Sequence, residues 1–217
     1  FNGDLYNDIA VGGLDLDDTD GSQPIQIWIN PRGATQGDPN LVSSLYSYNE
    51  TVHRMVPYRP GAPGPLWLSF IAANSTADVQ GNGDGTMQPF AAPWLSPVRT
   101  GLDAADLDGD ALVETVRLDW DNTSGNSTIR IERNGEFAGW LEFPGAHDGV
   151  RAVDWDSDGL LDLVTLNLDL SQLEVRLMDP SANMTFPTTL TYPVTVPLDG
   201  WVGGGWRSFI VMPFAAG

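Results

Sequence analysis

Short runs in which apolar and polar residues alternate recur along the whole chain. Alternation with a period of two predicts β-strands that have one buried face. An Asn-Gly pair at residues 134–135 separates two such runs, and this arrangement is a strong signal for a β-hairpin. Helical periodicity of useful length is missing. The sequence therefore predicts an all-β fold, with strands over residues 9–11, 25–29, 41–48, 66–73, 77–80, 87–94, 115–120, 128–132, 137–143, 163–168, 173–178 and 185–194.

The predicted strands repeat in the same order four times. Each repeat holds three strands and is followed by a strand that leads into the loop of the next repeat; these lead-in strands cover residues 52–58, 98–105, 149–153 and 208–217. A period of roughly 45 to 65 residues is typical of a β-propeller, whose blades are four-stranded sheets. A β-sandwich made of hairpins is the structural alternative. We expect one domain over residues 1–217, a β-propeller-type array of about four four-stranded blades, with units at about residues 1–48, 52–94, 98–144 and 149–195.

The two ends of the chain bear on how such an array would close. The last lead-in strand covers residues 208–217, whereas the chain begins inside the kind of loop that such a strand should enter. Three explanations remain open. The C-terminal strand completes the first blade of its own chain, it completes the first blade of a neighbouring subunit, or the chain is a slice of a longer repeat protein. The second explanation would link copies head to tail into an oligomer or filament.

Two acidic loops carry most of the chemistry that the sequence offers, and we call them the 106 loop (residues 106–114) and the 154 loop (residues 154–162). Their acids stand at loop positions one, three, five and nine: Asp106, Asp108, Asp110 and Glu114, and Asp154, Asp156, Asp158 and Asp162. Carboxylates crowded in this way repel one another unless a cation neutralises them. Oxygen ligands on alternate residues, closed by a carboxylate four residues later, suit a hard cation of the size of Ca²⁺. The sequence therefore predicts a calcium site in each loop.

Other residues complete or limit this prediction. The carbonyl oxygens of Leu112 and Leu160, at loop position seven, are expected to join the two ligand sets. A third, partial loop offers Asn2, Asp4 and Asp8 at positions three, five and nine, but it lacks an acid at position one. The matching loop of the second repeat, residues 59–65, has no acidic residue, so we expect no calcium there. Residues 82–85 lack a ligand at position nine and are expected to form a turn.

Two further loop positions have expected structural roles. Position two is apolar, as Leu107 and Trp155, and we expect this side chain to point away from the ion into the core. At position six Gly159 permits a sharp bend, whereas Ala111 at the same place predicts backbone strain in the 106 loop.

The acidic motifs resemble a known family. The Asp-Leu-Asp-Gly-Asp of residues 106–110 and the Asp-Trp-Asp-Ser-Asp-Gly of residues 154–159 resemble the loops of FG-GAP/VCBS repeats. The Asn-Gly-Asp of residues 2–4, followed by Asp-Ile-Ala-Val at residues 8–11, is similar to the same motif. The period extends the resemblance over most of the chain. It implies a calcium-binding β-propeller of the type found in the head of integrin α subunits, in some fungal lectins and in many bacterial surface proteins.

The charge of the chain excludes some partners. A formal net charge of −19 at pH 7 argues against binding of nucleic acid or of an anionic membrane, because phosphate groups are bound by Lys and Arg. All ten basic residues are Arg, which a GC-rich genome or a salt-adapted proteome would also explain. No apolar stretch approaches the length of a membrane-spanning helix, so we expect no membrane insertion.

Glycosylation motifs favour an extracellular or cell-surface location. The chain contains five Asn-X-Ser/Thr sequons, with acceptors at Asn49, Asn74, Asn122, Asn126 and Asn183. The alternative explanation is that Asn, Ser and Thr gather in turns. Cys is absent, so thiols do not indicate the compartment, and metal loops would replace disulfide cross-links in an extracellular setting.

The sequence offers little for catalysis. Neither His53 nor His147 stands in a metal-binding or nucleophile–base pattern, and we expect His147 to be a solvated surface residue in a turn. A Gly-X-Ser-X-Gly elbow, a phosphate-binding glycine loop and a nucleophilic Cys are missing. The acidic pairs that glycoside hydrolysis requires are best placed in the metal loops. We therefore expect no enzyme, and a polysaccharide lyase or hydrolase is the weakest alternative.

Eight Trp residues make a carbohydrate-binding lectin the stronger alternative, since aromatic faces stack on sugars. Trp28, Trp120 and Trp140 fall in strand alternations, and we expect them in the core or between blades. Trp201 and Trp206 flank a run of glycines and are candidates for an exposed binding surface. We expect a non-enzymatic, calcium-stabilised structural or adhesive module that binds a protein or glycan at the cell surface.

Overall fold

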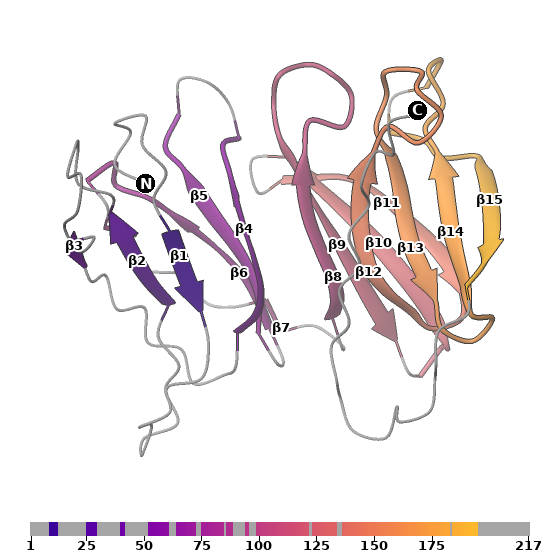
Figure 1. The fold of residues 1–217 in the computed structure, drawn as a ribbon, viewed down its shortest axis with the longest axis horizontal. Coiled ribbons are helices and arrows are strands. Elements are labelled where there is room, and N and C mark those ends of the chain that lie inside the picture. Colours follow the sequence, from indigo (N-terminus) through magenta and orange to yellow (C-terminus); the bar gives the residue numbers. More distant parts are fainter. Residues whose placement is uncertain are drawn as a thin grey trace, which may run out of the picture. The chain divides into compact units, whose positions relative to one another are not determined.

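The structure is a computed structural model that describes residues 9–12, 25–29, 40–41, 52–60, 64–72, 75–84, 86–88, 94–95, 99–121, 123–133, 136–182 and 184–194. The chain forms two compact units, Phe1–Ser96 and Pro97–Gly217, which we describe separately. The described residues contain β-strands and no helix, and the strands form four antiparallel sheets (Figure 1). The predicted all-β class is confirmed.

The first unit contains two sheets in which each strand pairs with the next along the chain. One sheet consists of β1 (Ile9–Gly12), β2 (Ile25–Ile29) and β3 (Asn40–Leu41), and the other of β4 (Val52–Tyr58), β5 (Trp67–Ala72), β6 (Ser75–Gln80) and β7 (Trp94–Leu95). Of the strands predicted over residues 41–48 and 87–94, the described residues contain only these short pieces, and Met87 forms an isolated bridge with Gly81. The turn predicted at residues 82–85 is supported by the hydrogen bond from Asn82 N to Thr86 O.

The second unit contains two four-stranded sheets, drawn in magenta to yellow in Figure 1. One consists of β8 (Arg99–Ala105), β9 (Glu114–Asp121), β10 (Asn126–Arg133) and β11 (Glu136–Pro144), and the other of β12 (His147–Val153), β13 (Asp162–Asn167), β14 (Gln172–Leu177) and β15 (Thr188–Pro193). Both are antiparallel meanders. The predicted lead-in strands of the second, third and fourth repeats are β4, β8 and β12, each the first strand of its sheet.

The core of the second unit lies between its two sheets. Alternate residues of β10 are buried, and this alternation brings Ile129 and Ile131 to the inner face. The cluster they join combines residues of both sheets: Leu107, Val116, Leu118, Ile129, Ile131, Phe143, Val150, Leu163, Met178 and Phe186. Full burial of each such side chain contributes about 1.5–3 kcal/mol. Leu107 belongs to the 106 loop, so this loop is anchored in the core, as its apolar position two predicts.

The first strands of these two sheets, β8 and β12, lie side by side. Ala152 N donates a hydrogen bond of 2.9 Å to Asp103 Oδ2, and Arg151 Nη1 donates one of 3.1 Å to Leu102 O. Gly101 permits the close approach, because a Cβ atom at this position would lie 2.7 Å from Val150 N. The two strands therefore meet through backbone and polar contacts, next to the apolar core.

The structure contradicts the predicted surface position of His147. Its side chain is 1% exposed, and its ring stands edge-on against Phe143 with 4.5 Å between ring centroids. Its Nε2 lies 3.2 Å from Glu174 Oε2. Burial lowers the pKa of His147, against the opposing effect of the Glu174 charge. The prediction was wrong because β12 begins at His147, two residues earlier than expected, which turns this side chain inward.

The structure also contradicts the interior position expected for Trp140. Its side chain is 59% exposed, and that of Phe137 on the same strand is 58% exposed. Both lie on β11, which is one of the two edge strands of its sheet. The guanidinium of Arg130 lies over the Phe137 ring at 5.7 Å from its centroid. Alternation along an edge strand shows which residues share a face, but not which face is covered, so the sequence could not distinguish the two cases.

Candidate metal centre

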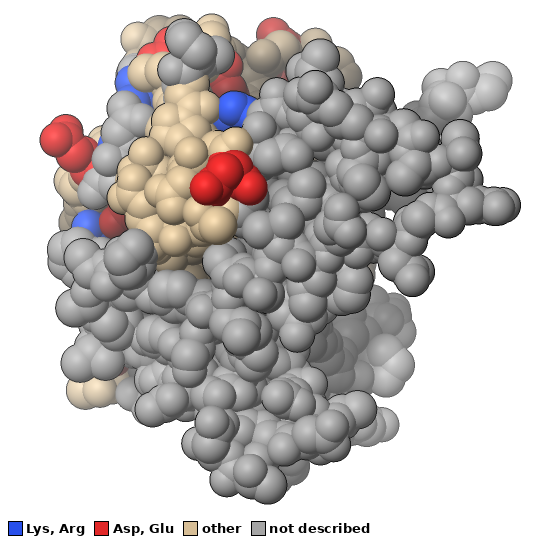
Figure 2. All heavy atoms as spheres, turned by 90° about the vertical axis from the view of Figure 1, so that its left-hand side faces the viewer, with Lys and Arg blue, Asp and Glu red and all other residues tan. Residues whose placement is uncertain are grey.

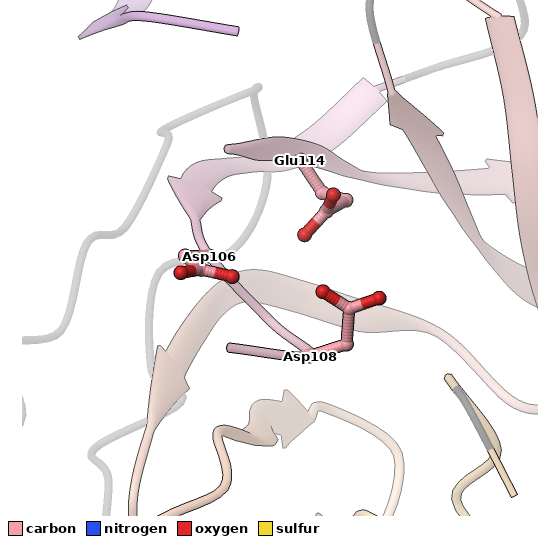
Figure 3. Close-up of side chains that lie close together, drawn as sticks. All are labelled: Asp106, Asp108 and Glu114. Carbon is pink, nitrogen blue, oxygen red and sulfur yellow. The ribbon is translucent and has the colours of Figure 1, made fainter. Parts of the chain in front are cut away.

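The 106 loop and the 154 loop occupy the same place in their two sheets. Each connects the first strand to the second, β8 to β9 and β12 to β13, and its position-nine acid is the first residue of the second strand. Carboxylate oxygens of Asp106, Asp108 and Glu114 lie within 4.8 Å of one another, and so do those of Asp154, Asp156 and Asp162. Figure 3 shows the first group, with its three side chains around a common space. The structure thus brings together three of the four predicted acids in each loop.

Both loops are held by the same hydrogen bonds from backbone N–H groups to carboxylates. The acid at position one accepts from position six, at 2.9 Å from Ala111 N and at 3.2 Å from Gly159 N. The acid at position five accepts from position seven at 2.8 Å, where Leu112 and Leu160 are the donors. The acid at position nine accepts from position two at 2.9 Å, where Leu107 and Trp155 are the donors. The same three hydrogen bonds recur in the two repeats, so the two loops share one backbone conformation.

The backbone of both loops bends sharply at positions four and six. The φ angles are 74° at Gly109 and 68° at Ala111 in the 106 loop, and 65° at Ser157 and 91° at Gly159 in the 154 loop. The strain predicted at Ala111 is present, because a non-glycine residue in the left-handed region costs about 1–2 kcal/mol. Both loops keep this tight turn despite the cost. The turn directs the carboxylates at alternate positions to one side of the loop.

The position-nine acids are the most buried of the eight. Glu114 is 0% exposed and Asp162 is 1% exposed. Burial raises the pKa of both carboxyl groups, and neighbouring aspartates add to this: Asp108 near Glu114, and Asp156 and Asp158 near Asp162. In addition, Asp106 Oδ1 is buried without a hydrogen-bond partner among the described residues. Hard oxygen donors of this kind fit a bound divalent cation, which would stabilise the charged form of each group.

Arg133 distinguishes the two loops. Its guanidinium contacts three acids of the 106 loop: Nη2 lies 2.7 Å from Asp108 Oδ2, Nη1 3.2 Å from Asp110 Oδ2, and Nε 2.6 Å from Glu114 Oε1. The hydrogen bond with Asp108 is the main cause that raises the pKa of Arg133. The sequence reading missed this residue. The signal that would have found it is the register of β9 and β10, because this pairing brings Arg133 opposite Glu114.

The 154 loop has a neutral group at the corresponding place. Met178 N donates a hydrogen bond of 2.9 Å to Asp162 Oδ1, the second oxygen of the position-nine acid. Within the part of the chain that the structure describes, Asp154, Asp156, Asp158 and Asp162 form no ion pair. Among the described residues, the contacts that balance the negative charge of this loop are therefore hydrogen bonds from backbone N–H groups.

The remaining predicted residues are placed as follows. Asp110 and Asp158 lie outside the two groups of close oxygens, and each accepts a hydrogen bond from the leucine at position seven. Trp155 is half-buried, and the centroid of its ring lies 5.4 Å from that of Tyr192 on β15. Of the two position-two residues that were expected in the core, Leu107 is buried there and Trp155 is not. Asn126 begins β10, and its Nδ2 donates to Glu142 Oε1 at 2.6 Å. Outside the described residues lie Asn2, Asp4, Asp8, Asn49, Asn74, Asn122 and Asn183.

Comparisons with models of known protein families and with curated proteins found no match. The resemblance to FG-GAP/VCBS repeats therefore rests on the loop motifs and stays a prediction.

Proposed function

We propose that the protein is a non-enzymatic, extracellular structural or adhesive module in which Ca²⁺ bound to the 106 loop and the 154 loop stabilises a β-propeller-type array. The observation that carries this proposal is that three hydrogen bonds recur in both loops and that three carboxylates lie close together in each. Carboxylates this close together repel one another, and the simplest explanation for the same arrangement in two loops is that each binds a cation.

Calcium suits the ligands better than other common cations. All side-chain donors are carboxylate oxygens, and the chain has no Cys to favour zinc or copper. Mg²⁺ demands a near-ideal octahedron and keeps several waters, whereas Ca²⁺ accepts six to eight oxygens in a flexible loop. The residues that would hold the ion are the four acids of each loop, with the carbonyl oxygens of Leu112 and Leu160.

The propeller arrangement has support from the second unit. Each of its sheets is a four-stranded meander, as propeller blades are. The two sheets pack through an apolar core, and their first strands lie side by side. Neighbouring blades of a propeller are related in this way, with their first strands nearest the central axis. The number of blades and the closure of the array are part of the proposal.

A surface role agrees with the charge of the molecule. Few described residues are visible on the face seen in Figure 2, and their Arg side chains are seen there as separate spots together with acidic and uncharged groups. Nucleic acids bind to basic patches or stripes, so we propose a protein or a glycan as the partner. No helix among the described residues is long and apolar enough to cross a membrane.

Chelation tests the calcium proposal directly. Removal of Ca²⁺ with EGTA should lower the free energy of unfolding by about 2.7 kcal/mol for each site that was filled at a hundredfold excess over its Kd. For a chain of this size, that change lowers Tm by about 5–10 °C per site. Differential scanning calorimetry before chelation, after chelation and after return of Ca²⁺ measures the effect, with Mg²⁺ as the control ion. An unchanged Tm would refute the structural role of calcium.

The exposed aromatic residues of β11 favour a lectin as the second candidate. Trp140 and Phe137 offer apolar ring faces to solvent on one edge strand, where a sugar ring can stack. A glycan array probed in the presence of Ca²⁺ separates a lectin from a scaffold. For a lectin we expect binding that Trp140→Ala reduces at least about tenfold, since an aromatic hot spot contributes more than about 2 kcal/mol. Absence of binding on the array would favour the scaffold.

A further inference from the structure

The two acidic loops share their backbone design but differ in the group that faces the position-nine acid. We propose that Arg133 acts as a tethered cation in the 106 loop, so that the 154 loop binds Ca²⁺ more tightly and fills first. This inference rests on the proposed calcium binding and assigns different roles to the two sites. In the 106 loop the guanidinium supplies part of the positive charge that the ion supplies in the 154 loop.

The contacts of Arg133 reach every acid of the 106 loop except the one at position one. Its nitrogens lie 2.6–3.2 Å from oxygens of Asp108, Asp110 and Glu114. A bound Ca²⁺ would require those carboxylates as ligands at about 2.3–2.6 Å. Two cations that share the same carboxylates repel each other, so the ion must either displace the guanidinium or bind beside it at a cost. The side chain of Arg133 is 26% exposed, which gives it a route to solvent.

The register of the sheets explains why only one loop has this cation. Arg133 is the last residue of β10, directly opposite Glu114 in the β9–β10 ladder. In the other sheet Leu163 is opposite Arg176, so the corresponding place at the end of β14 belongs to Leu177. The side chain of leucine is uncharged and cannot form an ion pair with the carboxylates. The hydrogen bond from Met178 N to Asp162 Oδ1 takes the place of the Arg133 contact.

The difference in charge sets the direction of the effect. Each loop has four carboxylates, but among the described residues a guanidinium offsets part of that charge in the 106 loop and none does so in the 154 loop. The Ca²⁺ affinity of such loops rises with the negative charge of the ligand set, over several orders of magnitude. We expect the 154 loop to bind at least about tenfold more tightly, and the 106 loop to keep its geometry when Ca²⁺ is scarce.

Isothermal titration of the full chain with CaCl₂ tests the proposal. Asp156→Asn disables the 154 loop and Asp108→Asn disables the 106 loop, so each background reports one site. In the Asp156→Asn background, Arg133→Gln should raise the affinity of the remaining site at least about tenfold, because a competing charge is removed. Arg133→Lys keeps a positive charge and should leave that affinity low.

Two controls make the result specific. In the Asp108→Asn background, Arg133→Gln should leave the affinity of the 154 loop unchanged. Arg130→Gln removes an arginine of the same strand that pairs with Glu132, and it should change neither site. Thermal unfolding followed by circular dichroism, with both proteins free of Ca²⁺, should show a lower Tm for Arg133→Gln than for the unchanged chain. Addition of Ca²⁺ should restore the Tm of the variant.

Several outcomes would overturn the inference. An affinity of the 106 loop that stays equal or falls in Arg133→Gln would show that the arginine supports the ion instead of competing with it. Failure of Arg133→Gln to fold even with Ca²⁺ would show that the ion cannot replace the guanidinium. Two Ca²⁺ sites of equal affinity would overturn this inference but leave the proposed function intact. Absence of Ca²⁺ binding in every variant would refute the proposed function itself.

Discussion

Replacement of Asp162 by Ala is expected to abolish Ca²⁺ binding in the 154 loop and to destabilise the metal-free protein as well. Asp162 is 1% exposed and accepts hydrogen bonds from Trp155 N and Met178 N. Its removal leaves two N–H groups without their acceptor, and each buried unsatisfied group costs about 1–3 kcal/mol. We expect the free energy of unfolding to fall by about 2–4 kcal/mol in urea denaturation with EGTA present.

Asp156→Ala is the matched control, because it removes a proposed ligand of the same loop that does not anchor the metal-free loop. Asp156 is exposed, and Asp158 N, which donates to it at 3.2 Å, also donates to Asp154 at 3.1 Å. This variant should lose Ca²⁺ binding and keep the stability of the metal-free state. Equal stability of the two variants in EGTA would contradict the anchoring role of Asp162, and intact Ca²⁺ binding in both would contradict the ligand assignment.

Gly101→Ala should destabilise the second unit by forcing β8 and β12 apart. A Cβ at this position would lie 2.7 Å from Val150 N and 2.9 Å from Gly149 C, and backbone atoms in a ladder cannot move aside as a side chain can. Overpacking of this kind typically costs about 1–3 kcal/mol and occasionally more. Urea denaturation of the Ca²⁺-loaded protein measures the loss.

Gly139→Ala is the control for the change of residue type. Gly139 lies on β11, and a Cβ there would meet no atom within 4 Å. Glycine-to-alanine substitution at an unstrained position generally raises stability by about 0.4–1 kcal/mol, because the unfolded chain loses freedom. We therefore expect Gly101→Ala to lower the free energy of unfolding and Gly139→Ala to raise it. If both variants were equally stable, the close approach of the two first strands would not be a real constraint.

Much of the fold could be predicted from local sequence because strands and turns are encoded locally. The alternating runs predicted over residues 128–132 and 137–143 correspond to β10 and β11, which pair with each other antiparallel. The clustering of the loop acids and the buried place of Leu107 were also predictable, because a fixed spacing of two residues directs side chains to one side of a bent loop. Backbone strain at Ala111 followed from the same comparison of loop positions.

Three features depended on contacts between distant residues, and the sequence reading missed them. Arg133 reaches the 106 loop only through the register of β9 and β10. The inward position of His147 depends on where β12 begins. The exposure of Trp140 depends on β11 being an edge strand, which the order of strands in the sheet decides. In each case the local pattern allowed two placements, and pairing between strands selected one.

Both β9 and β13 begin on a buried carboxylate, which has a consequence for the folding of the exported protein that we propose. Extracellular calcium modules typically bind their ion at about 10⁻⁴–10⁻³ M, far above the free concentration inside a cell. If the sites belong to this class, the second unit would be synthesised with its loops unfilled and would tighten only after export. The compartment itself would then act as the last step of folding.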